Sequence, residues 1–318
     1  MLASMRNAIL KKWKKINPWS NAGLPTLSTE EQTRLSWAKP IESYTTVPKV
    51  YQDFFEPYLA AGREFPYTIQ GPSYEGFFHR STEKLICDFG SDIFILGRNG
   101  NTYTARCYPL DKISYVEIRS VLLDSYIKIS GVTKEGLRAS SSIRFNTVTD
   151  YLFTPIVEKI RLSAIGRKGT DQEPETGLFD HLISINYKFM NYGRRSLLGG
   201  EKYSYSILQP EIRTPILKFL GRKFYRTIFP THMSILTDRE LIMIREEARQ
   251  SGNDRYGGIW DFIPLNKIGS LSLDKKGSNL LVLTIQLPEN ERLEYLYQAS
   301  ATEDLGKFLA RYKELTAK

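Results

Sequence analysis

The sequence predicts an α+β protein in which one unit, a bent antiparallel sheet followed by a helix, occurs twice. The first observation is an internal repeat, because residues 108–118 return in similar form as residues 263–273, an offset of 155. The second is that the segments around both copies have the alternating or continuous apolar character of strands. The third is that each copy ends in a segment whose apolar residues recur at helical spacing.

The repeated segment keeps four residues unchanged and replaces Asp111 by the similar Asn266. Downstream, we expect the offset of 155 to hold without a gap, so that residues 126–130 correspond to residues 281–285. The unchanged pairs are Pro109/Pro264, Leu110/Leu265, Lys112/Lys267 and Ile113/Ile268.

Upstream of the repeated segment, the second copy is longer. Residues 67–72 resemble residues 205–210, an offset of 138 in place of 155, so the second copy gained about 17 residues before the repeat. The extra residues lie mostly in two places, between Pro210 and Thr231 and in the turn between Glu246 and Gly258.

Helices are expected at both ends of each copy. Apolar residues within 50–55 and 179–190 suggest a lead-in helix before the first strand. The closing helix of the first copy should begin near Thr154 with Pro155 in its first turn, because a proline inside a helix costs roughly 3 kcal/mol.

Three short motifs of the second copy resemble those of the bacterial pleckstrin-homology-like domains. They are Gly-Gly-Glu at 199–201, Leu-Thr-Asp-Arg-Glu-Leu at 236–241 and Ile-Pro-Leu-Asn-Lys-Ile at 263–268. The first copy departs from this pattern, with Phe89-Gly-Ser-Asp-Ile where the threonine should stand. The resemblance implies two units of that family, each a bent sheet or partly open barrel capped by a C-terminal helix. It implies no particular activity.

Four segments are expected along the chain. Residues 1–47 form a basic amphipathic helix and linker, residues 48–165 the first domain and residues 179–318 the second. The polar segment 166–178, which contains glycine and proline, is the linker between the domains.

The composition indicates a basic protein of a reducing compartment. The 318 residues carry 44 Lys and Arg against 35 Asp and Glu, a formal charge of +9 that favours anionic partners. The two cysteines, Cys87 and Cys107, suggest small buried side chains and no disulfide framework. No apolar run has the length of a membrane span. We therefore expect a cytoplasmic protein that attaches to the inner face of the membrane or to another protein.

The N-terminal residues 1–16 have apolar side chains at helical spacing among five cations, with no acid before Glu30. A basic amphipathic helix with a tryptophan is typical of a membrane-surface anchor. The alternative is a helix that packs on a domain and exposes its lysines to solvent. The predicted anchor residues are Lys11, Lys12, Trp13, Lys14 and Lys15.

The longer insertion of the second copy, residues 210–229, mixes cations with large apolar side chains. Lysine and arginine suit phosphate groups as a point charge and a bidentate fork. We expect most of these cations to converge on one patch that binds an anionic headgroup, the alternative being a solvated basic face. The predicted residues are Arg213, Lys218, Arg222, Lys223 and Arg226.

No pattern typical of catalysis occurs. His79, His181 and His232 are far apart and have no His or Cys neighbour at metal-ligand spacing, and no phosphate loop or nucleophile motif is present. We therefore expect no cofactor, no metal and no enzyme. The favoured interpretation is a binding or scaffold protein that can also self-associate through sheet edges. The alternatives are a nucleic-acid-binding protein that uses residues 210–226, or an enzyme whose site has no recognised motif.

Overall fold

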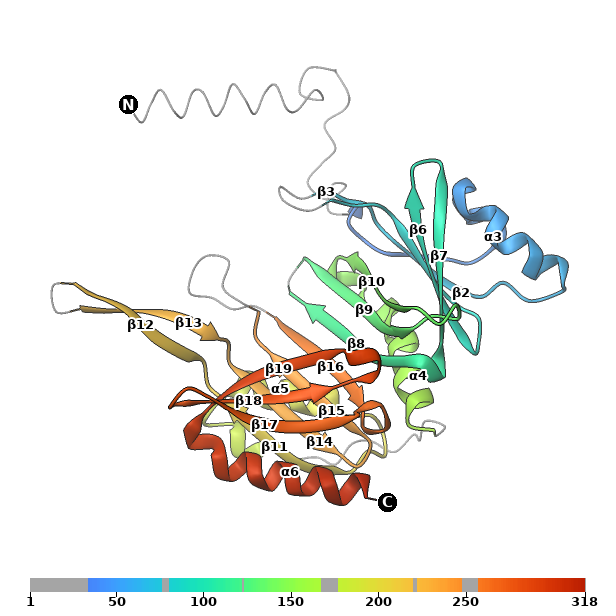
Figure 1. Ribbon diagram of the computed structural model, residues 1–318. Helices are drawn as coiled ribbons and strands as arrows, with labels where there is room; N and C mark the ends of the chain where they lie inside the picture. The colour runs from blue at the N-terminus through green and yellow to red at the C-terminus, as the bar shows by residue number, and fades with distance from the viewer. Residues whose placement is uncertain are drawn as a thin grey trace, which may run out of the picture. The chain divides into compact units, whose positions relative to one another are not determined.

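The computed structural model describes residues 34–75, 80–121, 123–166, 177–219, 222–247 and 257–317. The chain divides into two compact parts, residues 1–35 and 36–318, and the fold below is that of the second part. This part is α+β, as the sequence predicts, with antiparallel open sheets and a C-terminal helix (Figure 1). No helix among the described residues is long and apolar enough to cross a membrane.

The first half contains strands and helices up to the end of α4. Its helix α4 begins where Pro155 requires, since the helix starts one residue earlier and holds the proline in its first turn. The elements are β1 (Lys39–Ile41), η2 (Tyr44–Thr46), α3 (Lys49–Ala60), β2 (Tyr67–Gly71), β3 (Tyr74–Glu75), β4 (Arg80–Ser81), β5 (Lys84–Asp88), β6 (Asp92–Asn99), β7 (Thr102–Pro109), η3 (Leu110–Lys112), β8 (Ile113–Ser120), β9 (Ser125–Val132), β10 (Arg138–Phe145), η4 (Thr147–Leu152) and α4 (Thr154–Ala164).

The second half contains the remaining elements, from η5 to α6. Residues 167–176, most of the predicted linker, lie outside the described residues. The elements are η5 (Asp180–Leu182), α5 (Tyr187–Ser196), β11 (Tyr203–Gln209), β12 (Ile212–Phe219), β13 (Arg222–Phe229), β14 (His232–Thr237), β15 (Glu240–Arg245), β16 (Gly258–Pro264), η6 (Leu265–Lys267), β17 (Ser270–Lys276), β18 (Leu280–Gln286), η7 (Pro288–Asn290), β19 (Arg292–Gln298), η8 (Ala299–Ala301) and α6 (Thr302–Thr316).

The largest sheet runs through both halves. Its seven strands have the order β10-β9-β8-β16-β15-β14-β11, so β8 of the first half pairs with β16 of the second. Two further sheets have the orders β1-β2-β5-β6-β7 and β17-β18-β19, and two-stranded hairpins are formed by β3 with β4 and by β12 with β13. The strand β1 lies within the segment that the sequence analysis assigned to the N-terminal linker. It pairs with β2 and therefore belongs to the folded first half.

The two halves repeat the same local structure around the duplicated segment. Asp92 lies opposite Pro109 in the pairing of β6 with β7, and Glu240 lies opposite Pro264 in that of β15 with β16. A short 3-10 turn follows each proline and leads into the next strand. The two prolines and the turns that follow them, which differ by 155 in residue number, therefore occupy equivalent positions in the two halves.

The offset does not hold to the end of the chain, in contrast to the sequence-based expectation. In the pairing of β9 with β10, Ile127 lies opposite Ile143, and in that of β18 with β19, Leu283 lies opposite Tyr295. The offset is thus 156 between β9 and β18, where Ile127 corresponds to Leu283, and 152 between β10 and β19, where Ile143 corresponds to Tyr295. The physical reason is that the β9–β10 hairpin is two residue pairs longer at its turn than its counterpart. In the terminal helices an offset of 152 matches buried Ile156 with buried Phe308.

Each half has two large apolar clusters, one on either face of the sheet formed by its first long strands, which are β2, β5, β6 and β7 in the first half and β11, β14, β15 and β16 in the second. The inner clusters are closed by the C-terminal helices, with Ile156 of α4 in the first half and Phe308 of α6 in the second. The outer clusters are closed by the lead-in helices, with Phe55 of α3 against β5 and β6, and Phe189 of α5 against β14 and β15. The lead-in helices that the sequence predicted are therefore part of the packing.

Candidate functional site

The β12–β13 hairpin is the element that most clearly separates the second half from the first. Figure 1 shows it running outward from the second half as a two-stranded ribbon. Each strand has eight residues, which corresponds to a length of about 27 Å at about 3.4 Å per residue. In the first half the same place between the first two long strands is occupied by β3 and β4, of two residues each. About ten of the extra residues therefore build a long hairpin, since the offset rises from 138 before it to 148 between Asp92 and Glu240.

Apolar contacts and a carboxylate anchor the base of this hairpin. Ile212 is buried in a small cluster with Val282 and Leu296, and Phe229 packs against the same cluster. Glu211 accepts hydrogen bonds from the side chains of Thr227 and Arg213, the latter with a shortest N–O distance of 2.5 Å. The base is thus fixed to the outer face of the β17-β18-β19 sheet.

All five predicted headgroup-binding residues lie on this hairpin. In the backbone register Lys218 lies opposite Lys223 and Phe219 lies opposite Arg222, but the side chains of these three cations are outside the described residues. Arg213 lies opposite Thr227 and Arg226 opposite Thr214.

The pairs that contain Arg213 and Arg226 are adjacent in the ladder. Neighbouring pairs point to opposite faces of a ribbon, so these two arginines occupy opposite faces. The cations are therefore gathered on one element but not on one of its faces.

Two exposed apolar residues beside Arg226 were not identified from the sequence. Tyr225 is 54% exposed and Ile228 is 42% exposed, although both are large. Sequence reasoning also missed Glu211, which reduces the charge available from Arg213. Successive side chains of a strand point to opposite faces, and this alternation could have separated the anchoring residues from the exposed ones. Ile228 is exposed, whereas its neighbour Phe229 packs against the cluster at the base.

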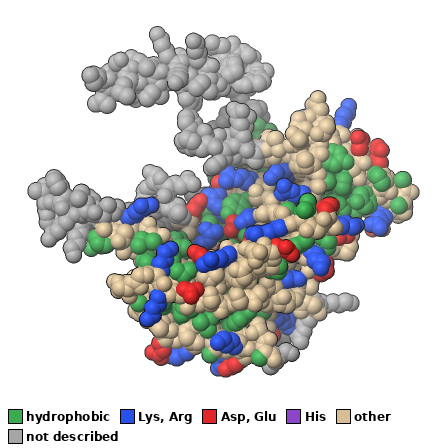
Figure 2. All heavy atoms as spheres, viewed as in Figure 1, with side chains coloured by type: hydrophobic (Ala, Val, Ile, Leu, Met, Phe, Trp, Pro, Cys, Tyr) green, Lys and Arg blue, Asp and Glu red, His purple; other side chains and the backbone are tan. Residues whose placement is uncertain are grey.

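The basic character of the chain is not confined to the hairpin. Figure 2 shows Lys and Arg side chains spread over the visible face, with Asp and Glu side chains between them. The predicted anchor residues Lys11, Lys12, Trp13, Lys14 and Lys15 lie outside the described residues.

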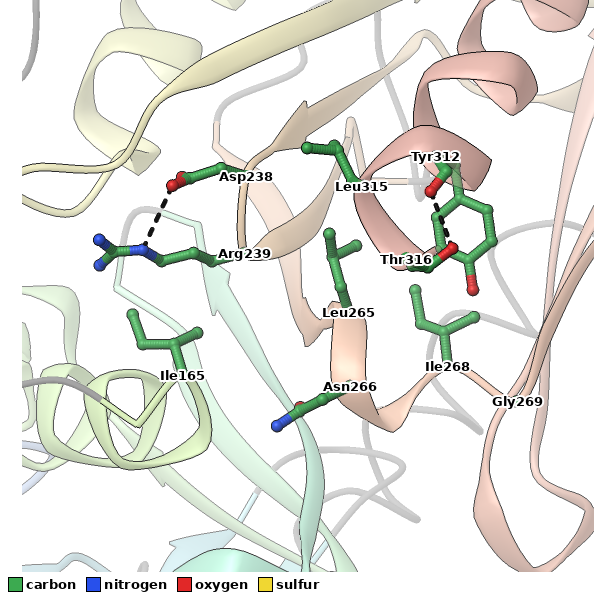
Figure 3. Close-up of a pocket in the computed structure, with 10 residues that line it drawn as sticks. All are labelled: Ile165, Asp238, Arg239, Leu265, Asn266, Ile268, Gly269, Tyr312, Leu315 and Thr316. Carbon is green, nitrogen blue, oxygen red and sulfur yellow. Dashed lines mark hydrogen bonds and ion pairs between the residues drawn. The ribbon is translucent and has the colours of Figure 1, made fainter. Parts of the chain in front are cut away.

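A second candidate is an open pocket of about 550 Å³ between the ends of α4 and α6 (Figure 3). Asn266 of η6 connects its side of the pocket to the end of α4, because its side-chain amide donates a hydrogen bond to the carbonyl oxygen of Ala164 at 2.7 Å. Asp238 and Arg239 form the charged end of the pocket, with a side-chain N–O distance of 3.5 Å. The lining residues are Ile165, Asp238, Arg239, Leu265, Asn266, Ile268, Gly269, Tyr312, Leu315 and Thr316.

The lining of this pocket is more polar than apolar. Leu265, Ile268 and Leu315 supply aliphatic side chains, and one of its hydroxyl groups, that of Thr316, donates to the carbonyl oxygen of Tyr312 at 2.9 Å. Burial raises the pKa of Tyr312 above its ordinary value, so that this phenol stays protonated near neutral pH. A lining that is more polar than apolar departs from the mostly apolar walls that are typical of small-molecule sites.

The remaining titratable candidates are buried or separate. Cys87 and Cys107 are free thiols and buried, and burial raises the pKa of Cys87 to about 12. His232 is fully buried, His181 is exposed and His79 lies outside the described residues. Among the described residues no group of three or more His, Cys, Asp or Glu side chains is placed to hold a metal ion. No protein-family model matches the chain, and no curated protein sequence matches it either.

Proposed function

We propose that the chain is a non-catalytic binding protein, made of two pleckstrin-homology-like repeats, that attaches to an anionic membrane surface through the β12–β13 hairpin. The observation that carries this proposal is the projecting ribbon itself, which has five cations and one acid between residues 210 and 229. Exposed Tyr225 and Ile228 flank exposed Arg226 on the same strand.

This combination of charges and apolar groups fits a lipid surface. Each cation close to an anionic leaflet contributes about 1 kcal/mol, and apolar side chains that enter the headgroup layer add to this. An extended ribbon can bring both kinds of side chain to a flat surface without any change in the fold. The cations on opposite faces of the ribbon suit insertion into a headgroup layer, where both faces meet phosphate groups.

The repeated order of elements supports the two-repeat description. Each half has a lead-in helix, a four-strand run, a 3-10 turn after a proline, a three-strand run and a closing helix. The domain limits of residues 48–165 and 179–318 belong to this proposal, with β1 added to the first repeat. Both limits lie within the one compact part, since β8 and β16 join the two halves in one sheet.

The test is co-flotation of the full chain with vesicles of phosphatidylcholine alone and of phosphatidylcholine with phosphatidylserine. We expect flotation only with the anionic vesicles, and weaker flotation at higher salt because screening shortens the reach of the charges. The double variant Arg222→Glu/Lys223→Glu should lose flotation. The matched control is Lys39→Glu/Lys49→Glu, which makes the same charge change at exposed sites away from the hairpin.

Equal flotation of the two double variants would contradict the assignment of the hairpin. If the unmodified chain does not float with either vesicle, the membrane proposal is wrong. A fluorescence-anisotropy titration with single-stranded nucleic acid then decides whether the same cations serve the nucleic-acid alternative.

A further inference from the structure

The joint between the two halves is a strand pairing between unlike edges. β8, an edge of the three-strand run of the first half, pairs antiparallel with β16, an edge of the four-strand run of the second. Five pairs form the joint, from Gly258 opposite Ser120 to Phe262 opposite Val116, with Trp260 opposite Ile118 at its centre. The two edges are not equivalent, so the joint is heterologous. Each half contains both kinds of edge, and the joint uses only one edge of each half, so one edge in each half has no strand paired to it in this way.

The repeat identifies the two remaining edges. The counterpart of β16 in the first half is β7, and the counterpart of β8 in the second half is β17. Each is the last strand of its sheet as described, since β7 pairs with β6 and β17 pairs with β18. Thr104, Ala105 and Arg106 of β7 are exposed, as are Ser272 and Asp274 of β17.

Three other edges of the described sheets, those of β10, β11 and β19, are covered. On β10, the carbonyl oxygens of Ser140 and Ser142 accept hydrogen bonds from the side chains of Arg106 and Lys84, each at 2.8 Å. Helix α6 packs against β11, and β12 lies against β19. Uncovered strand edges present unpaired N–H and C=O groups that can bind another strand.

We propose that β17 of one chain pairs antiparallel with β7 of a second copy of this chain, in the register that joins β8 to β16 within the chain. In that register Ala105 lies opposite Leu273, as Trp260 lies opposite Ile118. Thr104 lies opposite Asp274, and Arg106 lies opposite the small Ser272. Apolar residues thus meet apolar residues, and polar residues meet polar ones, which stabilises cross-strand pairs.

One hydrogen bond limits the length of this pairing. The backbone N–H of Lys134 donates to the carbonyl oxygen of Cys107 at 2.9 Å, because the longer β9–β10 hairpin reaches the end of β7. The part of β7 that is free for pairing therefore ends at Arg106. The pairing between copies is one residue pair shorter than the five-pair joint within the chain.

The charges next to the two edges support the same arrangement. At the joint within the chain, Arg161 of α4 binds Glu240 at the start of β15, with a side-chain N–O distance of 2.6 Å. The position equivalent to Arg161 in α6 is Lys313, which is exposed. The position equivalent to Glu240 is Asp92, because both acids lie opposite the repeated proline. The free β17 edge thus has the cation Lys313 beside it, and the free β7 edge has the acid Asp92 beside it.

Pairing of unlike edges makes a head-to-tail assembly. Each added chain presents a new free β17, so the assembly closes into a ring or continues as a filament according to the rotation at each joint. This inference rests on the repeat and not on the attachment to membranes, and it is tested without lipid.

The test is oxidative cross-linking of two full-length variants, Ala105→Cys and Leu273→Cys, alone and mixed. We expect a disulfide-linked dimer in the mixture and none in either sample alone, because each single variant carries one half of the pair. The off-register mixture of Ala105→Cys with Ser272→Cys should cross-link at least tenfold less, because these side chains point to opposite faces. Peptide mapping separates the new bond from any bond of Cys87 or Cys107.

A charge exchange tests the same contact without new cysteines. Sedimentation of the full chain should show a mass that rises with concentration, and Lys313→Glu or Asp92→Lys alone should weaken this association about tenfold through like-charge contacts. A chain with both substitutions should recover it. A chain that sediments as a monomer at every concentration and gives no mixed cross-link overturns the proposal. Equal cross-linking within a single-variant sample overturns it as well, because it shows pairing of like edges.

Discussion

Glu117 and Asp261 lie directly opposite each other where β8 pairs with β16, so two carboxyl groups meet at the joint between the halves. Both are buried, and the hydroxyl of Tyr295 donates to Asp261 with an O–O distance of 2.5 Å. The guanidinium of Arg245 lies 3.2 Å from a carboxylate oxygen of Glu117. Although burial opposes ionisation, the hydroxyl of Tyr126 and nearby cations hold the pKa of Glu117 below its usual range. Burial and the Glu117 carboxylate raise the pKa of Asp261 to about 7.

The raised pKa of Asp261 predicts that the contribution of this residue to the stability of the fold is lost as the pH rises from about 4 to about 7. The folded state holds the Asp261 proton more tightly than the unfolded state, so its contribution is complete below the unfolded pKa and lost above the folded one. One pKa unit corresponds to about 1.4 kcal/mol, which makes about 4 kcal/mol the upper bound. Asp261→Asn should flatten this part of the profile, as measured by urea unfolding between pH 4 and pH 8. The control Asp274→Asn removes an exposed carboxylate and should leave the profile as it is. An unchanged slope in Asp261→Asn contradicts the assignment.

The buried ion pair of Arg161 with Glu240 predicts a large loss of stability when one partner is removed. Arg161 is 6% exposed, Glu240 is fully buried, and the guanidinium stacks 3.9 Å from the centre of the Phe262 ring. Removing Arg161 leaves the buried carboxyls of Glu240 and Glu201 without their cation and costs about 3–5 kcal/mol. We expect this loss for Arg161→Met in chemical denaturation.

A double variant separates the pair from the packing. Arg161→Met/Glu240→Leu replaces both charges by apolar side chains, which is often close to neutral. It should therefore be more stable than Arg161→Met, which leaves Glu240 and Glu201 buried together without a cation. A double variant that loses as much as the sum of the two single variants shows that the pair contributes nothing through its contact. The nearby Glu201 carboxylate, 3.6 Å from Arg161, is the third member of this cluster and stays in place.

The sequence predicts the parts of each half but not the joint between them. Apolar periodicity and the repeated prolines identify the strands, the two lead-in helices and the start of α4. The pairing of β8 with β16 has no comparable signal, because edge strands join through backbone N–H and C=O groups, and every residue type except proline carries both. Arg161 illustrates the same limit. In the sequence it is one cation of an amphipathic helix, and only the fold places it against Glu240.

The candidate site was predictable in position but not in detail. The extra residues of the second copy identified the place of the hairpin, and all five cations lie on it. Which side chains anchor the base and which stay exposed depends on where the ribbon leaves the β18–β19 surface. Ile212 is buried there, whereas the equally apolar Ile228 is exposed. Composition does not distinguish these two isoleucines.

Exposed Tyr225 and Ile228 predict an apolar contribution to vesicle binding. If the hairpin enters the headgroup layer, Tyr225→Ser/Ile228→Ser should lower the partition coefficient on anionic vesicles about tenfold, which corresponds to about 1.4 kcal/mol. The fold should stay within about 0.5 kcal/mol of the unmodified chain, because the substitutions lie on the surface. The matched control is Val148→Ser/Tyr151→Ser, at two exposed positions of η4. Equal partition of both double variants would show that the hairpin contributes charge alone.

Buried His232 predicts a loss of stability in acid that differs in sign from the effect of Asp261. Its ring packs against Phe229 and Tyr297, and one ring nitrogen lies 3.1 Å from the carbonyl oxygen of Pro230. Burial lowers the pKa of His232 to about 4. The unfolded state therefore binds the proton first, and the contribution of His232 to stability falls as the pH drops from about 6.5 towards 4.

This prediction is checked by following the His232 ring signals by NMR together with urea unfolding across the same range. The signals should show no titration above about pH 5, and His232→Gln should remove this part of the acid-side loss while lowering stability at neutral pH through poorer packing. A His232 signal that titrates near pH 6.5, the ordinary value of a histidine, would place the ring in water and contradict its burial at the base of the hairpin.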